Sequence, residues 1–366
     1  MKQKALYYFV FALSLIGCSP TVSDIYITAD KEAYKNGELV FVSINEAMGA
    51  VAQLRKEGNK NTLTLHLMEG EYRISAPIRI TAELGPLHLK GEGEGRSVVK
   101  GSKLLNPKWE KYNDHIWMAQ LQKEDSFDQL FVNGQKQILA RYPEDAIAPE
   151  RVKTWSNPKG AFVHAMHSGE WGGFHYVSTG VDENGELELS GGYQNNRPSK
   201  MHAKYRMVEN VFEELDAPGE WFLDGDHKLF YWPAEGTDIN NVLVEVVQQK
   251  HLLEIVGSEE NPVRDIEISG IRFEHAQRTF MEKYEQLLRS DWTIYRGAAL
   301  FLEGTQNVKI KNCELTNLGG NAILASNFNR ELSIADNHIH DCGASGISFV
   351  GSPEAVRSPS FQYEEF

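Results

Sequence analysis

Apolar residues alternate with polar ones between positions 266 and 350, and this pattern recurs with a constant offset of 24 positions. The residues that repeat in register are Val308, Ile310, Cys313, Leu315, Leu318 and Ile323, which return as Leu332, Ile334, Asn337, Ile339, Cys342 and Ile347. An earlier copy, Ile266 to Ala276, precedes the first of these by 42 positions, which equals one period plus an insertion of 18 residues. The pattern predicts a β-solenoid with three short strands in each coil and about 4.8 Å between coils.

Two weaker repeats extend this pattern toward the N-terminus, each with an offset of 22. They relate Leu65 and Leu67 to Leu87 and Leu89, and Val244 and Val246 to Ile266 and Ile268. The alternative to a β-solenoid is an ordinary β-sandwich in which the repeat is accidental. The unbroken register of the six apolar positions favours the solenoid.

A helix is expected before the first coils. Between Ser43 and Glu57 the apolar residues Ile44, Ala47, Met48, Val51 and Leu54 have helical spacing, and Gly58 follows. Because a solenoid exposes the edge of its first coil, we expect this short amphipathic helix to cap it.

The period is lost in the middle of the chain. Residues 105–241 contain hairpin patterns, such as Asn133-Gly134 and Asp224-Gly225 between apolar runs, which predict an inserted β domain. We therefore divide the chain into a leader (1–18), a cap with the first coils (19–104), the inserted domain (105–241), further coils (242–352) and a terminal loop (353–366). A second insertion, Gln277 to Arg296, interrupts the later coils, and a short helix from Met281 to Leu288 is expected in it.

The N-terminus has the features of an export signal. Lys2 and Lys4 precede an apolar run from Ala5 to Ile16, which is too short to span a membrane. Leu15-Ile16-Gly17-Cys18 resembles a bacterial lipobox, which implies that Cys18 is lipidated and anchors the protein in the cell envelope, on an undetermined face. A net charge of −14 argues against nucleic acid and against an anionic membrane surface as partners.

The other two cysteines, Cys313 and Cys342, stand in different columns of the repeat. An oxidising envelope permits a disulfide, but free thiols are the expected state.

Several segments together resemble a known family. They are Phe131-Val132-Asn133-Gly134, Leu139-Ala140-Arg141-Tyr142-Pro143, Glu214-Leu215-Asp216-Ala217-Pro218-Gly219-Glu220-Trp221, Leu318-Gly319-Gly320-Asn321-Ala322 and Gly343-Ala344-Ser345-Gly346-Ile347. From about residue 30 to 366 the chain resembles glycoside hydrolase family 141. The resemblance implies an all-β fold, a right-handed parallel β-helix with an inserted β domain, and the degradation of plant-type polysaccharides.

The family's proposed catalytic aspartates lie in coils that follow the segment Val356-Arg357-Ser358-Pro359. The resemblance therefore implies that the chain is the N-terminal part of such an enzyme, and it assigns no catalytic residue here. A glycosidase needs two carboxyl groups about 5–9.5 Å apart, which stacked coils can supply. The expected columns are Glu274–Thr316–His340, His275–Asn317–Asp341, Gly270–Asn312–Asp336 and Arg272–Glu314–His338, and none places two carboxylates on adjacent coils.

Polar residues near the predicted turns are candidates for substrate binding. The column of His275, Asn317 and Asp341 is either a ladder that satisfies turn amides or one edge of a sugar groove. The full candidate set is His275, Trp292, Tyr295, Asn317, Asn321, His340 and Asp341. Trp292 and Tyr295 belong to it because they lie in the loop that interrupts the coils.

Other aromatic and histidine residues suggest packing or surface roles. Trp155, Trp171, Tyr176, Tyr193, His164, His167 and His175 are expected to pack within the inserted domain. His338, His340 and Asp341 crowd one coil, but we interpret them as turn and surface residues and expect neither a metal nor another cofactor.

Three functions remain open at this point: part of a glycoside hydrolase, a glycan-binding β-helix without catalysis, and a polysaccharide lyase. A lyase would need an acidic calcium cluster beside a basic residue, for which Asp336, Asp341 and Arg330 are the candidates. All three functions imply a polysaccharide or oligosaccharide ligand.

Overall fold

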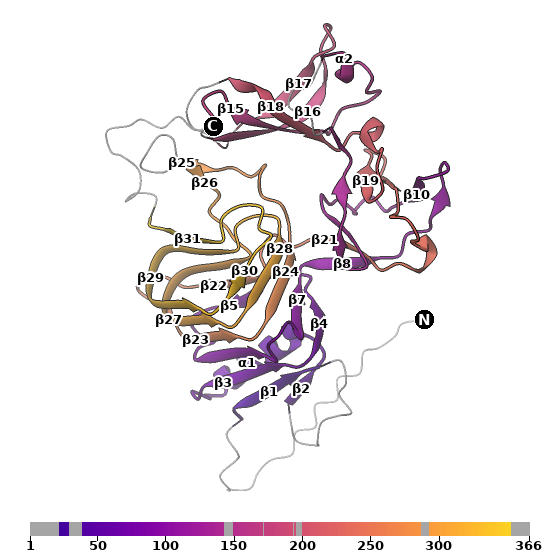
Figure 1. The fold of residues 1–366 in the computed structure, drawn as a ribbon. Helices are drawn as coiled ribbons and strands as arrows, with labels where there is room; N and C mark the ends of the chain where they lie inside the picture. The colour runs from indigo at the N-terminus through magenta and orange to yellow at the C-terminus, as the bar shows by residue number, and fades with distance from the viewer. Residues whose placement is uncertain are drawn as a thin grey trace, which may run out of the picture.

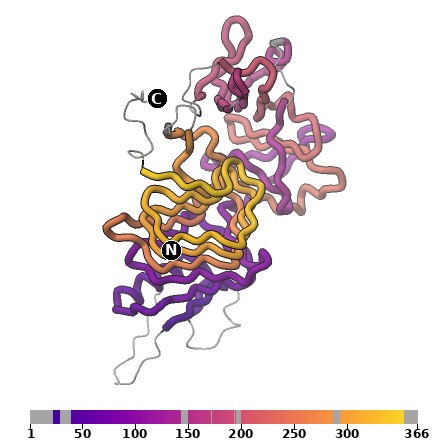
Figure 2. The backbone as a smooth tube through the Cα atoms, turned by 60° about the vertical axis from the view of Figure 1, so that its left-hand side comes forward, coloured from indigo at the N-terminus to yellow at the C-terminus, as the bar shows by residue number. Residues whose placement is uncertain are grey.

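The computed structural model describes residues 22–28, 39–142, 149–170, 172–192, 194, 200–286 and 293–352. Stacked coils form one part of the molecule, and the strands between residues 102 and 247 lie beside the later coils (Figure 1). The backbone trace shows the coils stacked in chain order (Figure 2). No helix in these described ranges has the length and apolarity needed to span a membrane.

Two parallel sheets run along the coil stack. The larger has ten strands: β1 (Asp24–Ile27), β2 (Leu39–Phe41), β3 (Leu63–Leu67), β5 (Ile78–Ile80), β6 (Leu87–Gly91), β22 (Leu253–Val256), β23 (Val263–Ser269), β27 (Leu300–Lys311), β29 (Ile323–Ala335) and β31 (Ile347–Val350). The smaller has five: β4 (Gly70–Arg73), β7 (Ser97–Lys100), β24 (Arg272–Ala276), β28 (Glu314–Leu318) and β30 (His338–Ile339).

The predicted offsets of 24 and 42 are confirmed by strand pairing. Val308 pairs with Leu332, and Ile266 pairs with Val308. The same offset of 24 relates Leu315 to Ile339 in the smaller sheet. These apolar side chains point inward and form a single core cluster inside the coils, so burial maintains the register.

The two repeats predicted with an offset of 22 are wrong, because neither relates residues that pair in adjacent coils. Leu89 pairs with Leu65, again 24 positions away, because β4 and β5 complete a full coil between β3 and β6. Val244 and Val246 lie in an antiparallel strand, β21 (Val244–Val247), which pairs with β8 (Ser102–Leu105) and β11 (Leu130–Val132) instead of with a coil. The first strand of the larger sheet after the inserted strands is therefore β22.

The predicted helix is present as α1 (Ile44–Lys56). Ser43 Oγ accepts a hydrogen bond from the Glu46 amide, 3.2 Å away, and caps its N-terminus. Ile44, Ala47 and Val51 are buried in the coil core, and α1 contacts β1 and β2. The helix thus packs at the first coil, where an edge was expected to need cover.

The inserted strands form three mainly antiparallel sheets. One contains β9 (Glu110–Lys111), β10 (Trp117–Gln120), β13 (Ile138–Leu139), β19 (Glu220–Leu223) and β20 (Lys228–Tyr231), and another contains β14 (Arg141–Tyr142), β15 (Phe162–His167), β16 (Gly173–Val181), β17 (Leu187–Gly191) and β18 (Met201–Glu209). The third contains β8 (Ser102–Leu105), β11 (Leu130–Val132), β12 (Gln135–Lys136) and β21. Both predicted hairpins are confirmed, since Val132 pairs with Gln135 and Leu223 with Leu229.

Short elements complete the described fold. They are α2 (Pro149–Val152), the 3₁₀ turns Phe212–Glu214 and Ile239–Asn241, and a ribbon of β25 (Glu285–Gln286) and β26 (Thr293–Ile294). The prediction of a helix from Met281 to Leu288 is wrong for residues 281–286, which the structure describes, because Glu285 and Gln286 form a strand that pairs with β26.

Columns of glycine, asparagine and aspartate adopt a left-handed conformation, both between coil strands and within the long strands β23 and β27. Gly270, Asn312 and Asp336 have φ values of +67°, +53° and +56°, and Asn307 and Asp265 stand in a similar column. Asn307 Nδ2 donates to Asp265 Oδ1 at 2.6 Å. Glycine, asparagine and aspartate tolerate positive φ best, which explains why these residue types recur where the chain turns.

A buried ionic cluster joins the coils to the inserted strand β21. Lys100 Nζ lies 2.8 Å from Glu71, 3.3 Å from Glu245 and 3.0 Å from Glu274. Arg73 also contacts Glu245, at 2.7 Å, and the side chain of Glu245 is fully buried. Since a buried charge requires a partner, this cluster fixes the position of the inserted strands on the coils.

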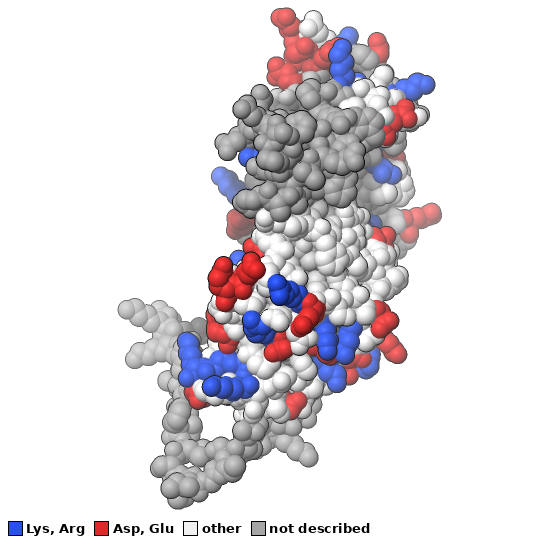
Figure 3. Space-filling view, turned by 90° about the vertical axis from the view of Figure 1, so that its left-hand side faces the viewer, with Lys and Arg blue, Asp and Glu red and all other residues white. Residues whose placement is uncertain are grey.

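The coil surface carries both signs of charge. On the face shown in Figure 3, lysine and arginine alternate with aspartate and glutamate over the lower coils. One such pair of opposite charges on the coils is Lys311 with Glu267, 3.0 Å apart. The charge of −14 is thus not gathered into one acidic patch on this face.

Candidate functional site

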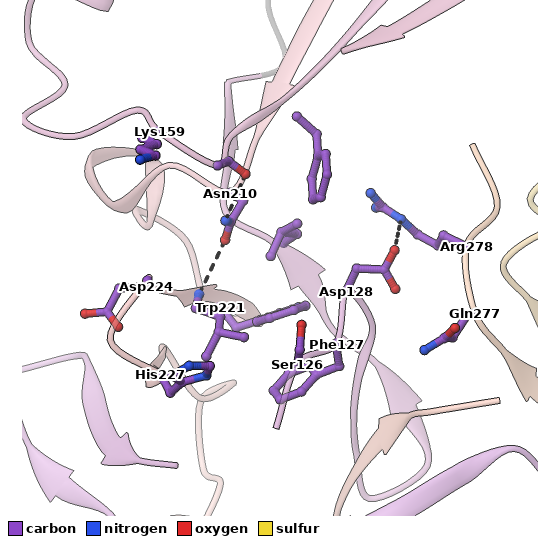
Figure 4. A pocket seen from close by; sticks show the side chains of 15 residues that line it. Ser126, Phe127, Asp128, Lys159, Asn210, Trp221, Asp224, His227, Gln277 and Arg278 are labelled. Atoms are coloured by element: carbon purple, nitrogen blue, oxygen red, sulfur yellow. Dashed lines mark hydrogen bonds and ion pairs between the residues drawn. The ribbon is translucent and has the colours of Figure 1, made fainter. Parts of the chain in front are cut away.

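A cleft of about 440 Å³ lies where the inserted strands meet the coils (Figure 4). Most of its wall comes from the insertion, including the turn between β19 and β20, and Gln277 and Arg278 of the coil side close it. Its lining residues are Ser126, Phe127, Asp128, Leu139, Lys159, Gly160, Phe162, Asn210, Trp221, Leu223, Asp224, Gly225, His227, Gln277 and Arg278. The wall therefore combines aromatic rings with charged and amide groups.

Phe127 and Trp221 form the aromatic part of this wall. Their rings stack with centroids 5.4 Å apart and planes inclined by 29°. Strand β19 fixes Trp221, which is 1% exposed, and its indole N–H has no partner among the described residues. A buried donor without an acceptor costs about 1–3 kcal/mol.

Arg278 connects the two parts of the molecule. It lies two residues beyond β24, on the coil side, and its Nε is 3.0 Å from Asp128 Oδ2 in the insertion. Its Nη2 donates to Glu209 Oε1 at the end of β18. The guanidinium also lies over the ring of Phe280, 4.3 Å from the centroid. One cation thus holds two carboxylates and an aromatic ring.

Burial and charge move the pKa values of these two carboxyl groups in opposite directions. Burial raises the pKa of Asp128, and the neighbouring Glu209 charge adds to this effect while Arg278 opposes it. Burial also raises the pKa of Glu209, but the hydrogen bond from His164 and the charge of Arg278 outweigh it and bring the pKa to about 2.

A second hollow of about 240 Å³ lies on the other side of Arg278. His164 and His175 face each other there, with their Nδ1 atoms 2.7 Å apart, and His164 Nε2 is 3.0 Å from Glu209. Burial lowers the pKa of His175 to about 4, with a further contribution from His164. Burial also lowers the pKa of Lys136, which lines the same hollow.

The structure buries His275, which the sequence suggested for a groove edge. Its ring is 1% exposed, stacks on Phe131 with centroids 3.8 Å apart, and contacts Ser102 Oγ at 2.8 Å. Burial lowers its pKa to about 4. The inserted strand β11 covers this corner of the coil, so His275 packs at a junction and lines neither hollow.

The rest of the predicted column stands near strand ends, with Asn317 the penultimate residue of β28 and Asp341 just beyond β30. Asn317 and Asp341, like His275, have positive φ, at +51° each. This geometry fits the turn interpretation of the column. Asp341 is exposed beside His340, whose Nδ1 lies 2.7 Å from Asp341 Oδ2.

Asn321 and Tyr295 meet at the second insertion. Asn321 is buried and donates to the carbonyl oxygens of Tyr295 and Gly297, at 3.1 and 2.9 Å, so its amide holds the loop. Tyr295 is half-buried, and burial raises its pKa to about 12. Its ring lies 6.4 Å from that of Tyr284, which lines the second hollow.

Some predicted residues fall outside the described ranges or pack internally. Cys18, Trp171, Tyr193 and Trp292 lie outside the described residues. Trp155 is buried and donates to Glu214 at 2.5 Å, which confirms its packing role. Cys313 and Cys342 are free thiols, as expected.

The main cleft residues were missed by the sequence analysis. Asp128, Trp221 and Arg278 stand far apart in sequence, and no spacing relates them. Only the position of Arg278 could have indicated a role in binding. It lies at the start of the predicted second insertion, and loops that leave a solenoid commonly build its binding surface.

Comparison with known proteins supports the fold. A family model described as a right-handed β-helix region matches residues 228–361. Among solved structures, one titled as a glycoside hydrolase matches with a TM-score of 0.67 and 16% sequence identity. The match covers 83% of this chain and 64% of the length of that protein. No curated protein sequence matches the chain.

Two further solved structures match with lower scores. The complex of XylC with xylose has a TM-score of 0.44 and 14% identity, covering 88% of this chain and 54% of the other. The tailspike gp61 of Pseudomonas phage phi297 has a TM-score of 0.18 and 11% identity, covering 85% and 45%. The right-handed β-helix region and the structural similarity to a glycoside hydrolase rest on the family model and the structure with a TM-score of 0.67.

Proposed function

We propose that this chain binds an oligosaccharide or polysaccharide in the cleft beside Arg278, as the carbohydrate-recognising part of a β-helix glycoside hydrolase related to family 141. The observation that carries the proposal is the composition of the cleft wall, where the Phe127–Trp221 pair stands close to the ion pair of Arg278 and Asp128. Sugars present apolar faces and many hydroxyl groups, so a site for them needs flat apolar surface with a few fixed donors and acceptors.

The two hollows provide room for more than one sugar. Both are lined by Arg278, and the smaller one reaches Tyr284, next to Tyr295. We propose that a glycan extends from Phe127 past Arg278 toward Tyr295, and we keep Trp292, which lies outside the described residues, as a binding candidate from the sequence. We keep the other candidates from the sequence, Asn317, His340 and Asp341, as outer contacts of the glycan.

The proposal assigns binding and no catalytic step to the described residues. Across the paired strands of adjacent coils in the described ranges, no carboxylate stands on another carboxylate: Glu274 pairs with Thr316, and Glu314 with His338. A lyase mechanism gains no support here either, because no acidic calcium cluster is present among the described side chains.

Phe127→Ala is expected to weaken glycan binding about tenfold, because a lost aromatic contact of about 1.4 kcal/mol corresponds to this factor. Affinity electrophoresis of the full chain in gels containing plant cell-wall polysaccharides, xylan among them, measures the effect. The control is Tyr205→Ala, which removes an aromatic side chain that is 43% exposed and does not line the cleft. Retardation by none of the polysaccharides, or equal retardation of Phe127→Ala and the unmodified chain, would contradict the proposal.

The loop aromatics are tested separately. Trp292→Ala combined with Tyr295→Ala is expected to lower affinity for long glycans more than for short ones, since these residues would contact the far end of the chain. Isothermal titration with oligosaccharides of increasing length measures the difference. Unchanged affinity at every length would remove Trp292 and Tyr295 from the site.

We also propose that the protein is exported and lipid-anchored through Cys18, on the evidence of its lipobox-like sequence. Labelling of cells with a fatty-acid analogue should mark the unmodified protein and not Cys18→Ala. Equal labelling of both would exclude Cys18 as the attachment point.

A further inference from the structure

Three side chains gather on the smaller coil sheet, away from the cleft. Glu314 begins β28, and His338, its register partner on the next coil, begins β30. His340 follows His338 by two positions and so faces the same side of the strand. One potential ligand atom from each residue lies within 4.8 Å of the others, and within the described residues this group alone has that geometry.

The separations suit a small divalent ion. Two donors bound to a tetrahedral Zn²⁺ at about 2.0–2.1 Å lie about 3.3 Å apart. His340 Nε2 and Glu314 Oε1 are 3.3 Å apart. The imidazole rings of His338 and His340 stack with centroids 4.2 Å apart and planes inclined by 29°. Parallel rings on one strand allow both to direct a nitrogen toward the same point.

A carboxylate also fixes the orientation of His340. Its Nδ1 lies 2.7 Å from Asp341 Oδ2 and 3.3 Å from Thr316 Oγ1, which leaves Nε2 directed toward Glu314. Histidines that bind metals characteristically use their other nitrogen in this way, and the carboxylate fixes the tautomer and the ring angle. Asp341 therefore acts as a positioning residue for His340.

One neighbouring cation opposes a metal ion at this position. Arg272 Nη2 lies 3.1 Å from Glu314 Oε1, the same oxygen that faces His340. The guanidinium repels a metal ion and competes for the carboxylate. Without metal, Arg272 and His340 share Glu314 in an ordinary ionic network.

We propose that Glu314, His338 and His340 form a binding site for Zn²⁺ or a similar first-row divalent ion, oriented by Asp341 and weakened by Arg272. Two histidines and one carboxylate are a donor set that such ions prefer, and the exposure of His338 leaves solvent access for a further ligand. From the sequence, His338, His340 and Asp341 were interpreted as turn and surface residues and no metal was expected, whereas the structure brings Glu314 to the two histidines. The inference does not rest on the cleft beside Arg278, although His340 and Asp341 are also among the outer glycan contacts proposed above.

Isothermal titration of the full chain with ZnCl₂, with Co²⁺ absorption spectra in parallel, tests the site. The unmodified chain should bind one Zn²⁺ with high affinity, and His338→Ala or Glu314→Gln should abolish this binding. Asp341→Asn should weaken it about 10–100-fold, as loss of an orienting carboxylate does elsewhere. Arg272→Met should strengthen it.

The matched control is His66→Ala. His66 also pairs with a carboxylate, Asp24, at 2.7 Å, but no second histidine joins that pair. Its removal should leave the titration unchanged. Absence of a high-affinity isotherm in the unmodified chain, or full retention of it in His338→Ala with circular dichroism showing an intact fold, would overturn the proposal.

Discussion

Lys100→Met is expected to destabilise the protein by about 3–5 kcal/mol, the usual cost of breaking a buried ion pair by removing one partner. The ammonium group of Lys100 lies within 3.3 Å of Glu71, Glu245 and Glu274. Methionine preserves much of the volume and removes the charge. The buried carboxylates of Glu245 and Glu274 would then keep only Arg73 and Arg272 as cation partners, and Glu245 has no exposed surface through which water could compensate.

The size of this effect should depend on pH. The pKa of Glu245 is lowered in the folded protein, against the effect of burial, by its hydrogen bond from Arg73 and the charge of Lys100. A depressed carboxyl pKa contributes stability above the unfolded value of about 4.3, and this contribution is lost as the pH falls through the folded value. The difference between Lys100→Met and the unmodified chain should therefore be largest near neutral pH and shrink in acid.

Denaturant unfolding followed by circular dichroism, at neutral and acidic pH, measures both effects. Lys309→Met is the control, because Lys309 is an exposed lysine on the coil strand β27. Its unfolding midpoint should stay close to that of the unmodified chain. A neutral-pH midpoint for Lys100→Met that matched the control would show that the cluster does not stabilise the fold.

Arg278→Ala is expected to destabilise the junction by about 3–5 kcal/mol and to abolish detectable glycan binding. Arg278 is the shared partner of Asp128 and Glu209, both of which are largely shielded from water. Its removal would leave two carboxylates facing each other between the coils and the insertion. The cleft and the second hollow would then lose the wall that they have in common.

Lysine should not replace this arginine fully. A guanidinium offers several donors in one plane and can hold both carboxylates while lying over Phe280, whereas an ammonium is a compact point charge. Arg278→Lys should therefore recover part of the stability and little of the binding. Unfolding midpoints and affinity electrophoresis, measured on the same samples, separate the two effects.

Acid titration provides an independent check of the same contact. The pKa of Glu209 is about 2 in the folded protein, so its contribution to stability is complete above the unfolded value of about 4.3 and decreases as the pH falls toward 2. In Arg278→Ala this decrease should flatten. Arg264→Ala, at an exposed arginine of strand β23, should keep the steep decrease of the unmodified chain. The same acid profile in Arg278→Ala and Arg264→Ala would contradict the role given to Arg278.

The coil register could be predicted because each coil repeats one local pattern. Val308 and Leu332 stand in equivalent positions and bury equivalent side chains, so their offset in sequence equals their pairing in space. The prediction failed for Val244 and Val246, which alternate like coil residues but pair with the antiparallel strands β8 and β11. Alternation identifies a strand with one buried face and does not identify its partner.

The sequence by itself therefore determined the parallel coils, the helix α1, the two hairpins and the turn residues, because each depends on neighbours within one period or one turn. The tertiary structure alone decided where the insertion docks, and with that the cleft, the burial of His275 and the shared contacts of Arg278. Asp128 and Arg278 are 150 positions apart, and Lys100 and Glu245 are 145 apart. Nothing in a repeat specifies such contacts, since they arise from the packing of two separately formed surfaces.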